Sequence, residues 1–478
     1  MRVPIGQIAI GIALAAVATW FATLHDFTGT HASDWPRTGL ASAIVVGWAV
    51  LTVTLHRRRA PVAVDTGSDT IHVVYATQTG YAAELANLTA ATLRHGGDAV
   101  ALQSIDTLTP ATLQGAKRML FIASTTGEGD APDPATGFRR DVMAGALALQ
   151  GLSYGLLALG DHDYEDFCAF GHDLDRWLRS SGAVPAFDLV EVDNGDPGAL
   201  RHWQHHVAEW AGSPEAPDWV RPAYQSWRLV ERRLLNPGSA GGPCFHIALA
   251  PVDAGHLRWD AGDVVEIGPR RGRDDEQVHP HREYSIASLP SDKTLHLVVR
   301  QQRDATGSLG LGSGWLTALA DIGDAVDLRV RRNEGFHAPG DDRPMLLIGN
   351  GTGIAGLRAL LKERVARGHV RNWLIFGERH AGVDRLHVDE LERWRADGRV
   401  ERLDLVWSRE TQGARYVQDR LRAAADDVRS YVDDGAAIYV CGSLAGMAPG
   451  VDAALRGILG ERAVDDILAD GRYRRDVY

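Results

Sequence analysis

Three apolar runs in the first half of the sequence each end in a loop of small, polar and aromatic residues. The runs are residues 70–75, 119–123 and 154–159, and a helical pattern follows the first loop at residues 83–94. Strands that alternate with helices predict a parallel sheet, and open parallel sheets bind ligands at the carboxyl ends of their strands. We therefore expect an α/β domain whose ligand is held by these three loops.

The first loop, residues 77–82, has the composition of an anion site. Its threonine hydroxyls precede a helix, where free backbone N–H groups and the positive end of the helix dipole attract a phosphate. The loop has no Gly-Lys-Thr, which excludes a nucleoside triphosphatase loop. Taken alone, it fits an ordinary strand-to-helix turn with a threonine N-cap equally well.

Together the three loops resemble the flavodoxin-like domain of diflavin reductases in order and spacing. TQTGYA resembles the FMN phosphate loop, while STTGEGDAPDPA and LGDHDYEDFC resemble the two loops beside the flavin ring. The resemblance implies that Tyr164 stacks on the ring, and Thr126 stands where many relatives have an aromatic residue. The FMN-binding residues that it implies are Thr77, Gln78, Thr79, Gly80, Tyr81, Ala82, Ser124, Thr125, Thr126, Gly127, Leu159, Gly160, Asp161, Tyr164, Phe167, Cys168 and Asp193.

Short β-rich runs follow at residues 244–250, 264–267 and 295–301, with Gly and Pro between them, and predict an antiparallel β-barrel. Among them, REYSIAS at residues 282–288 supplies a cation, an aromatic ring and hydroxyl donors, which suit a diphosphate and a flat ring. This run resembles the RxYSxxS signature of ferredoxin-reductase-like FAD domains; a chance strand edge is the alternative. The FAD-binding residues that the resemblance implies are Arg282, Glu283, Tyr284, Ser285, Val298, Val299, Arg300, Gly310, Leu311, Gly312 and Ser313.

A strand, a Gly-rich turn and a helix at residues 344–355 resemble the nicotinamide loop of the same family. Ser408 and Arg409 resemble the pair that grips the 2′-phosphate of NADP, since a planar guanidinium suits a phosphate. We therefore expect NADPH in preference to NADH. The nucleotide-binding residues that the resemblance implies are Gly351, Thr352, Gly353, Ser408, Arg409, Arg415, Tyr416 and Gln418.

The sequence ends in RRDVY, which resembles the ending of sulfite-reductase-type members of this family. The resemblance implies that Tyr478 covers the FAD ring until nicotinamide displaces it. It also implies that Ser285, Cys441 and Asp476 surround the reacting atoms, where they can orient the carboxamide and stabilise the developing positive charge. From its position alone, Cys441 would instead be a buried structural thiol.

The N-terminal part predicts a membrane anchor. Residues 5–24 and 38–55 are uncharged and long enough to cross a bilayer, and the HRRR run after them is typical of a cytoplasmic end. We expect a transmembrane hairpin over residues 1–59 and a linker over 60–69, with the lipid bilayer as a partner and the soluble domains in the cytoplasm. A cleaved signal peptide is the alternative for the first run.

The charge and the cysteine content disfavour several classes of partner, metal site and cross-link. A net charge of −12 disfavours nucleic acid. Three scattered cysteines without a CxxC spacing disfavour disulfides, a zinc site and a cysteine-ligated iron–sulfur cluster, so we expect no metal site. Residues 121–200 carry fourteen Asp or Glu against four Arg and no Lys. That segment is either a solvated acidic face or a docking surface for a basic partner.

The whole pattern predicts three soluble domains: a flavodoxin-like domain at 70–213, an FAD-binding barrel at 217–340 and an NADP-binding domain at 341–478. The resemblance implies an NADPH-dependent diflavin reductase that passes single electrons through FMN to a haem or metalloprotein acceptor docked on the acidic domain. A ferric or ferric-siderophore reductase module is the alternative, and a membrane flavoprotein sensor is an alternative of another class. Only about 70 residues separate Trp210 from Arg282, where full diflavin reductases insert a helical connecting domain.

Overall fold

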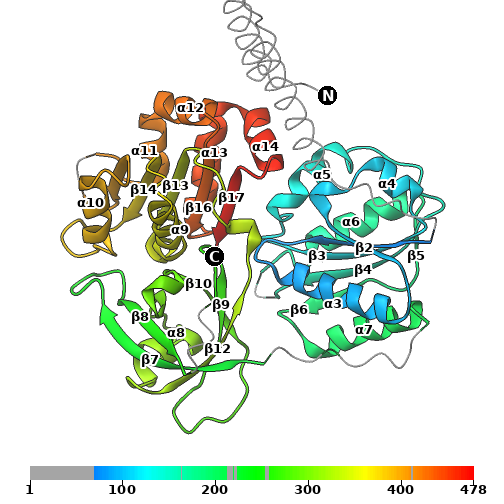
Figure 1. Ribbon diagram of the computed structural model, residues 1–478, viewed down its shortest axis with the longest axis horizontal. Helices are drawn as coiled ribbons and strands as arrows, with labels where there is room; N and C mark the ends of the chain where they lie inside the picture. Colours follow the sequence, from blue (N-terminus) through cyan, green and yellow to red (C-terminus); the bar gives the residue numbers. More distant parts are fainter. Residues whose placement is uncertain (1–68, 163, 213–218, 220–222, 253–257, 411–412) are drawn as a thin grey trace, which may run out of the picture. The chain divides into compact units, whose positions relative to one another are not determined.

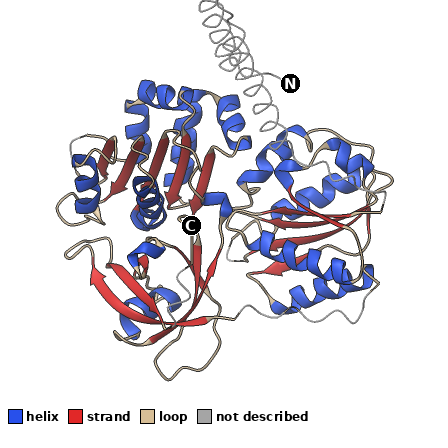
Figure 2. Cartoon of the chain, viewed as in Figure 1, coloured by secondary structure: helices blue, strands red, loops and turns tan. Residues whose placement is uncertain are grey.

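The computed structural model describes residues 69–478 except 163, 213–218, 220–222, 253–257 and 411–412. Three β-sheets follow one another along this part of the chain (Figure 1). The first and third sheets are parallel and have helices on both faces, while the middle sheet is antiparallel (Figure 2). Parallel sheets need such cover because both of their faces are apolar.

The first sheet contains the three apolar runs as neighbouring strands. Its order is β2-β1-β3-β4-β5, and β6 pairs with β4 beyond the end of β5. The strands are β1 (Ile71–Ala76), β2 (Val100–Ser104), β3 (Arg118–Ser124), β4 (Ser153–Gly160), β5 (Val184–Pro185) and β6 (Val190–Asp193). Because β1, β3 and β4 are parallel, their carboxyl ends meet at one edge of the sheet.

Helices cover both faces of this sheet and bury one apolar cluster on each. Phe121 and Leu120 are adjacent in β3 and belong to different clusters, as alternating strand side chains must. The last helix begins at Pro197, where the Asp196 carboxylate accepts a hydrogen bond of 2.7 Å from the Ala199 amide. The helices are α3 (Tyr81–His95), α4 (Pro110–Gly115), α5 (Thr136–Asp141), α6 (Ala169–Ser180) and α7 (Pro197–Trp210), with 3₁₀ turns η1 (Ile105–Thr107) and η2 (Asp133–Ala135).

The middle sheet has the order β10-β9-β12-β7-β8-β11. Its strands are β7 (Gln225–Leu234), β8 (Cys244–Pro251), β9 (Val264–Gly268), β10 (Arg282–Ser285), β11 (Leu295–Arg300) and β12 (Ala325–Arg331). The short helix α8 (Leu311–Gly314) continues into one π-helical turn, η5 (Trp315–Leu319). The 3₁₀ turns are η4 (Pro290–Asp292) and η6 (Glu334–Phe336).

The predicted closed barrel is wrong. All pairings in this sheet are antiparallel, as expected, but the order ends at β10 and β11 and the sheet does not close between them. Strand β10 has only four residues and pairs with β9. Closure depends on strand tilt and stagger, which a pattern of short β-rich runs does not encode.

The third sheet has the order β15-β14-β13-β16-β17, and all of its strands are parallel. They are β13 (Met345–Asn350), β14 (Asn372–Glu378), β15 (Arg402–Trp407), β16 (Ala437–Gly442) and β17 (Tyr473–Val477). The helices are α9 (Ile354–Ala366), α10 (Val388–Ala396), α11 (Val417–Ala423), α12 (Ala425–Asp433), α13 (Met447–Leu459) and α14 (Glu461–Ala469), and the turn η7 (Gly351–Gly353) precedes α9. The register of β16 and β17 places Cys441 opposite Asp476.

The prediction of a membrane-anchored protein needs correction. Within the residues that the structure describes, no helix combines the length and the apolar character needed to span a bilayer. The two runs on which the prediction rested, residues 5–24 and 38–55, lie outside the described residues, as does most of the expected linker at 60–69. A lipid bilayer as a partner therefore has no support from the described helices.

No α-helix occurs between α7 and α8 in the part of the chain that the structure describes. The strands β7 to β11 occupy this interval, so the helical connecting domain of full diflavin reductases has no counterpart among the described residues. The boundaries proposed above for the three domains stay predictions, since all described residues belong to one compact unit.

Candidate functional site

A cavity of about 270 Å³ lies at the carboxyl ends of β1, β3 and β4. Thirteen of the residues expected at FMN line it: Gln78, Thr79, Tyr81, Ser124, Thr125, Thr126, Gly127, Leu159, Gly160, Asp161, Tyr164, Phe167 and Cys168. We call it the first cavity. The sequence did not indicate the walls contributed by His281, Leu444 and Val477, because these residues lie far along the chain from the three loops.

Four expected FMN residues stand behind the wall of this cavity. Thr77 accepts a hydrogen bond of 3.0 Å from the Gly80 amide through its hydroxyl, and Gly80 has a φ of 91° at the start of α3. Ala82 is buried in α3. Asp193 accepts a hydrogen bond of 3.0 Å from the His162 amide and so ties the loop after β4 to the end of β6. These residues shape the loops.

The first cavity fits a flavin with its phosphate. The buried hydroxyl oxygens of Thr125 and Thr126 have no hydrogen-bond partner among the described residues, and the amino end of α3 opens nearby. A Cβ atom at Gly160 would stand 2.8 Å from the Cys168 amide nitrogen, so only glycine leaves that wall flat. Burial raises the pKa of Cys168 to about 12, which keeps this thiol neutral.

A second cavity, also of about 270 Å³, gathers every residue expected at FAD. These are Arg282, Glu283, Tyr284, Ser285, Val298, Val299, Arg300, Gly310, Leu311, Gly312 and Ser313, and Gln302, Thr352 and Ala355 join them. A Cβ atom at Gly312 would stand 2.7 Å from the Tyr284 hydroxyl oxygen, so this backbone must stay bare beside the ring. The short helix α8 and the guanidinium of Arg282 suit a diphosphate.

The first and second cavities share two wall residues, Glu283 and Tyr478. Glu283 forms a 2.6 Å ion pair with Arg331, which also pairs with the buried Glu266 at 2.7 Å. Burial opposes ionisation of Glu283, but hydrogen bonds from His281 and Arg331 outweigh it and lower the pKa to about 2. The wall between the two cavities is therefore held by paired charges.

Ser285, Cys441 and Asp476 form one buried cluster. The Ser285 hydroxyl donates to a carboxylate oxygen of Asp476 at 2.7 Å, and the Cys441 thiol lies 3.7 Å from the same oxygen. Burial raises the pKa of Asp476 and that of Cys441. Tyr478 stands two residues beyond Asp476 and lines the second cavity. The structure thus brings together the four residues that the resemblance implied at the reacting atoms.

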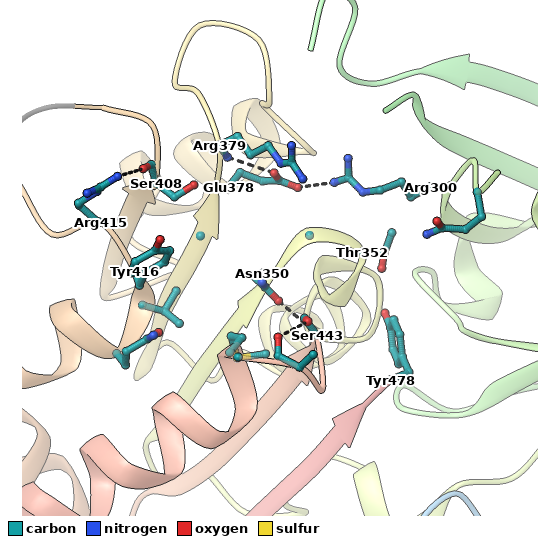
Figure 3. A pocket seen from close by; sticks show the side chains of 18 residues that line it. Arg300, Asn350, Thr352, Glu378, Arg379, Ser408, Arg415, Tyr416, Ser443 and Tyr478 are labelled. Atoms are coloured by element: carbon teal, nitrogen blue, oxygen red, sulfur yellow. Dashed lines mark hydrogen bonds and ion pairs between the residues drawn. The ribbon is translucent and has the colours of Figure 1, made fainter. Parts of the chain in front are cut away.

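A third cavity, of about 740 Å³, opens at the carboxyl edge of the third sheet (Figure 3). Seven expected residues line it: Gly351, Thr352, Ser408, Arg415, Tyr416, Gln418 and Tyr478. The guanidinium of Arg415 donates to the Ser408 carbonyl at 3.4 Å, so cation and hydroxyl stand together at one end. Thr352 and Tyr478 stand together toward the other end of Figure 3. An elongated nucleotide fits this arrangement.

Two expected nucleotide residues do not line the third cavity. Gly353 lies behind the turn, where a Cβ atom would overlap the Cys441 carbonyl oxygen, so this glycine permits close packing of the turn on β16. Arg409 donates its backbone amide to the Arg379 carbonyl at 2.9 Å and is not in the wall. Arg379 lines the cavity instead, and sequence reasoning missed it because it follows β14 without a recognised motif.

The wall of the third cavity also contains Asn350, Ser443, Arg300 and Glu378 (Figure 3). The Asn350 side chain accepts from the Ser443 amide at 2.9 Å and joins the ends of β13 and β16. Arg300 of the middle sheet forms a 2.7 Å ion pair with Glu378 at the end of β14. This pair links the second and third cavities, since Arg300 lines both.

Comparisons with known proteins point to the same combination. A family model described as flavodoxin matches residues 73–203, and one described as oxidoreductase NAD-binding domain matches residues 347–453. The chain is similar to the sulfite reductase [NADPH] flavoprotein alpha-component of Neisseria meningitidis serogroup C, with 26% identity over 85% of this chain and 89% of that protein. The two matched domains and this relative support the diflavin reductase family for this chain.

Proteins of the same name from other bacteria show a similar match. The one from Mannheimia succiniciproducens is 24% identical over 85% of this reductase and 90% of its own length, and the one from Shewanella sp. is 25% identical over 88% and 91%. The Neisseria alignment spans 540 residues, more than the 478 of this reductase. The relatives therefore carry segments that the present diflavin reductase lacks.

The diflavin reductase is an NADPH-dependent flavoprotein oxidoreductase whose cofactors are FMN, FAD and NADPH. When bound, these groups supply hydride transfer and its division into single electrons. The protein supplies the walls that position them.

Proposed function

We propose that the reductase takes hydride from NADPH beside the Ser285–Cys441–Asp476 cluster and delivers single electrons from the first cavity to a separate haem or metalloprotein acceptor. The observation that carries this proposal is the common wall of the two flavin cavities, formed by Glu283 and Tyr478. Two cavities that share walls hold their contents close enough for electrons to pass without a further carrier.

Ser285, Cys441 and Asp476 have separate tasks in this proposal. Ser285 fixes the Asp476 carboxylate through its 2.7 Å hydrogen bond, so that the carboxylate faces the nicotinamide as positive charge develops there. Cys441 fills the floor and orients the carboxamide. All three side chains are buried, which excludes water and strengthens each electrostatic contact. Tyr478 occupies the nicotinamide place until the nucleotide displaces it.

Recognition of NADPH is proposed at the far end of the third cavity. Ser408 and Arg415 supply a hydroxyl and a guanidinium group, a set that favours a 2′-phosphate over a free ribose hydroxyl. Tyr416 is half exposed at the rim, where an adenine can stack on its ring. Gln418, in the first turn of α11, lines the same cavity two residues after Tyr416.

The acceptor is proposed to dock on the acidic flavodoxin-like domain. Glu128, Asp130, Glu165 and Asp166 are exposed, and Asp166 also lines the first cavity. A rim of carboxylates attracts a basic protein surface and speeds its encounter. The relatives are named as the alpha-component of sulfite reductase, so a haemoprotein component is the acceptor class that we propose.

The experiment that tests this function supplies NADPH to the purified chain together with the haemoprotein component of a bacterial sulfite reductase or with ferric citrate. We expect the haemoprotein to be reduced at a rate that falls steeply with added salt, because the docking charges are screened. A triple change of Glu128, Asp130 and Glu165 to Gln should slow that reaction and leave reduction of the bound flavins by NADPH unchanged. Fast salt-independent reduction of ferric citrate, with no reduction of the haemoprotein, would overturn the proposal in favour of a ferric reductase.

A further inference from the structure

A network of three side chains ties the flavodoxin-like domain to the strand that carries Asp476. Asp133 opens the turn η2 at the end of the second flavin loop and is 7% exposed. Its amide donates to the side-chain oxygen of Gln78 at 2.9 Å, and the Gln78 amide nitrogen donates back to an Asp133 carboxylate oxygen at 3.1 Å. The same nitrogen donates to the carbonyl of Arg475 in β17 at 2.5 Å. The FMN phosphate loop thus reaches β17 directly.

Arg475 is held on its main chain and on its side chain. Its backbone amide donates to an Asp133 carboxylate oxygen at 3.1 Å, and its Nε donates to the other oxygen at 2.8 Å, with a further ion-pair contact from Nη2. Strand β17 is the end strand of its sheet, so its outer edge has no strand to pair with. Asp133 and Gln78 take the place of that missing strand at Arg475.

The next residue along β17 is Asp476, whose carboxylate meets Ser285 and Cys441 on the inner side. Side chains of successive strand residues point to opposite faces, so Arg475 and Asp476 hold the strand from its two sides. Tyr478 ends this stretch, with its amide bonded to the Gly442 carbonyl at 3.0 Å. Any shift of β17 along its edge therefore moves the carboxylate and Tyr478 together.

A second link fastens the flavodoxin-like domain to another sheet without touching β17. Glu84 of α3 forms a 2.8 Å ion pair with Arg329 of β12, and Arg329 pairs with the buried Glu266 at 2.5 Å. Because this link fastens the flavodoxin-like domain to the middle sheet alone, it provides a control for effects of domain fastening in general.

We propose that Asp133 is a positioning residue for hydride transfer: through Arg475 it holds β17 in the register that places the Asp476 carboxylate against Ser285 and Cys441. The inference rests on the proposed role of the Ser285–Cys441–Asp476 cluster. It makes docking of the flavodoxin-like domain a condition for full activity at the FAD, a step that does not itself use FMN. The domain that receives the electrons thereby sets the geometry of the step that supplies them.

The test uses the full chain with both flavins and compares Asp133→Asn and Arg475→Gln with the control Glu84→Gln. Hydrogen–deuterium exchange of the peptide that contains β17 gives a readout that does not depend on turnover. We expect faster exchange of that peptide in Asp133→Asn and Arg475→Gln, and the unmodified protein's rate in Glu84→Gln. Unchanged exchange in Asp133→Asn would overturn the proposal.

Rapid mixing with NADPH, followed at the FAD absorbance, gives the second readout. We expect the limiting rate of FAD reduction to fall about tenfold or more in Asp133→Asn, the scale at which misplaced groups slow reactions, with little change in the NADPH concentration for half-saturation. Arg475→Lys keeps the charge and the main-chain contacts, so it should recover most of the rate of FAD reduction that Arg475→Gln loses. If Asp133→Asn and Glu84→Gln slow FAD reduction equally, the network only fastens domains. Because the measurement ends at FAD, failure of any acceptor to react bears on the proposed function alone.

Discussion

The Ser285 hydroxyl donates a 2.7 Å hydrogen bond to Asp476, which lies 191 positions further along the chain. The first residue belongs to the middle sheet and the second to the third sheet, so the bond forms only when the two sheets are assembled. Burial raises the pKa of Asp476, and Cys441 completes the contact from the opposite strand. The proposed site of hydride transfer is thus a product of tertiary packing.

The first prediction concerns Asp476→Asn. We expect hydride transfer to slow by about 10- to 100-fold, because loss of a buried charge contact costs about 1.5–3 kcal/mol at the transition state. In the unmodified protein the rate should fall as the pH falls through the raised pKa of Asp476, since protonation removes the negative charge. Stopped-flow reduction with NADPH across pH measures both effects. A variant that keeps the acid-side fall in rate would show that another group is responsible.

The second prediction concerns nucleotide preference. The double change of Ser408 and Arg415 to Ala should raise the KM for NADPH about tenfold or more and leave the KM for NADH nearly unchanged, since only NADPH offers a phosphate to these groups. Arg409→Ala is the matched control, because Arg409 does not line the cavity. Steady-state kinetics with both nucleotides decide it. Equal losses for NADPH and NADH would remove these residues from phosphate recognition.

The third prediction concerns Tyr478→Ala. The ring competes with nicotinamide, and NADH has less binding energy than NADPH with which to displace it. We expect the variant to reduce FAD faster with NADH, to narrow the NADPH preference and to release NADP⁺ more slowly. Rapid mixing with each nucleotide tests this. A rate with NADH that stays the same or falls would make Tyr478 a structural cover.

The fourth prediction concerns the hydroxyls of Thr125 and Thr126. Changing both to Val should lower the FMN content below one per chain and leave one FAD per chain, because each lost hydrogen bond weakens FMN binding by about 1 kcal/mol. Acid release followed by chromatography counts the two flavins in the same sample, so FAD is the internal control. One FMN per chain in the double variant would show that FMN binds away from these two hydroxyls.

The fifth prediction concerns stability in acid. His246, His296 and His387 contact one another by their rings, and burial lowers their pKa values to about 4, 3 and 2. Unfolding exposes these imidazoles, which then take up protons below pH 6.5. The three histidines therefore contribute their full stabilisation above pH 6.5. Below that pH the free energy of unfolding falls, by up to about 1.4 kcal/mol per pH unit for each histidine.

The thermal unfolding midpoint at pH 7.5 and pH 5.5 measures this effect. His246→Phe should lose less stability between the two pH values than the unmodified protein, while His205→Gln on the exposed face of α7 should lose the same amount. Parallel pH curves for His246→Phe and the unmodified protein would show that the buried histidines do not govern the acid response.

Residues of a motif that is contiguous in sequence also lie together in the structure. All eleven residues expected at FAD line one cavity, because each group of them lies on one short element, as Arg282 to Ser285 do on β10. Neighbours in sequence can still diverge: Ser408 lines the third cavity while Arg409 turns to the Arg379 carbonyl. The roles of Arg379 and Arg475 could not be predicted from the sequence, because they depend on which strands end side by side.

Larger features depended on information that local patterns lack. The antiparallel pairing of the middle sheet was predicted correctly, but the predicted closure into a barrel was wrong, because β10 and β11 end the order without pairing to each other. Three of the six strands of the first sheet were predicted, because buried parallel strands are apolar throughout, as residues 119–123 are.

The wall that Glu283 and Tyr478 share has a kinetic consequence. Since both flavin cavities belong to one polypeptide, the second partner of the electron transfer is always present at a high effective concentration, on the order of millimolar for linked modules. Transfer between the flavins should then follow first-order kinetics, and dilution of the protein should not slow it. After the flavins are reduced, only the encounter with the external acceptor depends on concentration, which leaves that final step as the one a cell can control through the supply of partner.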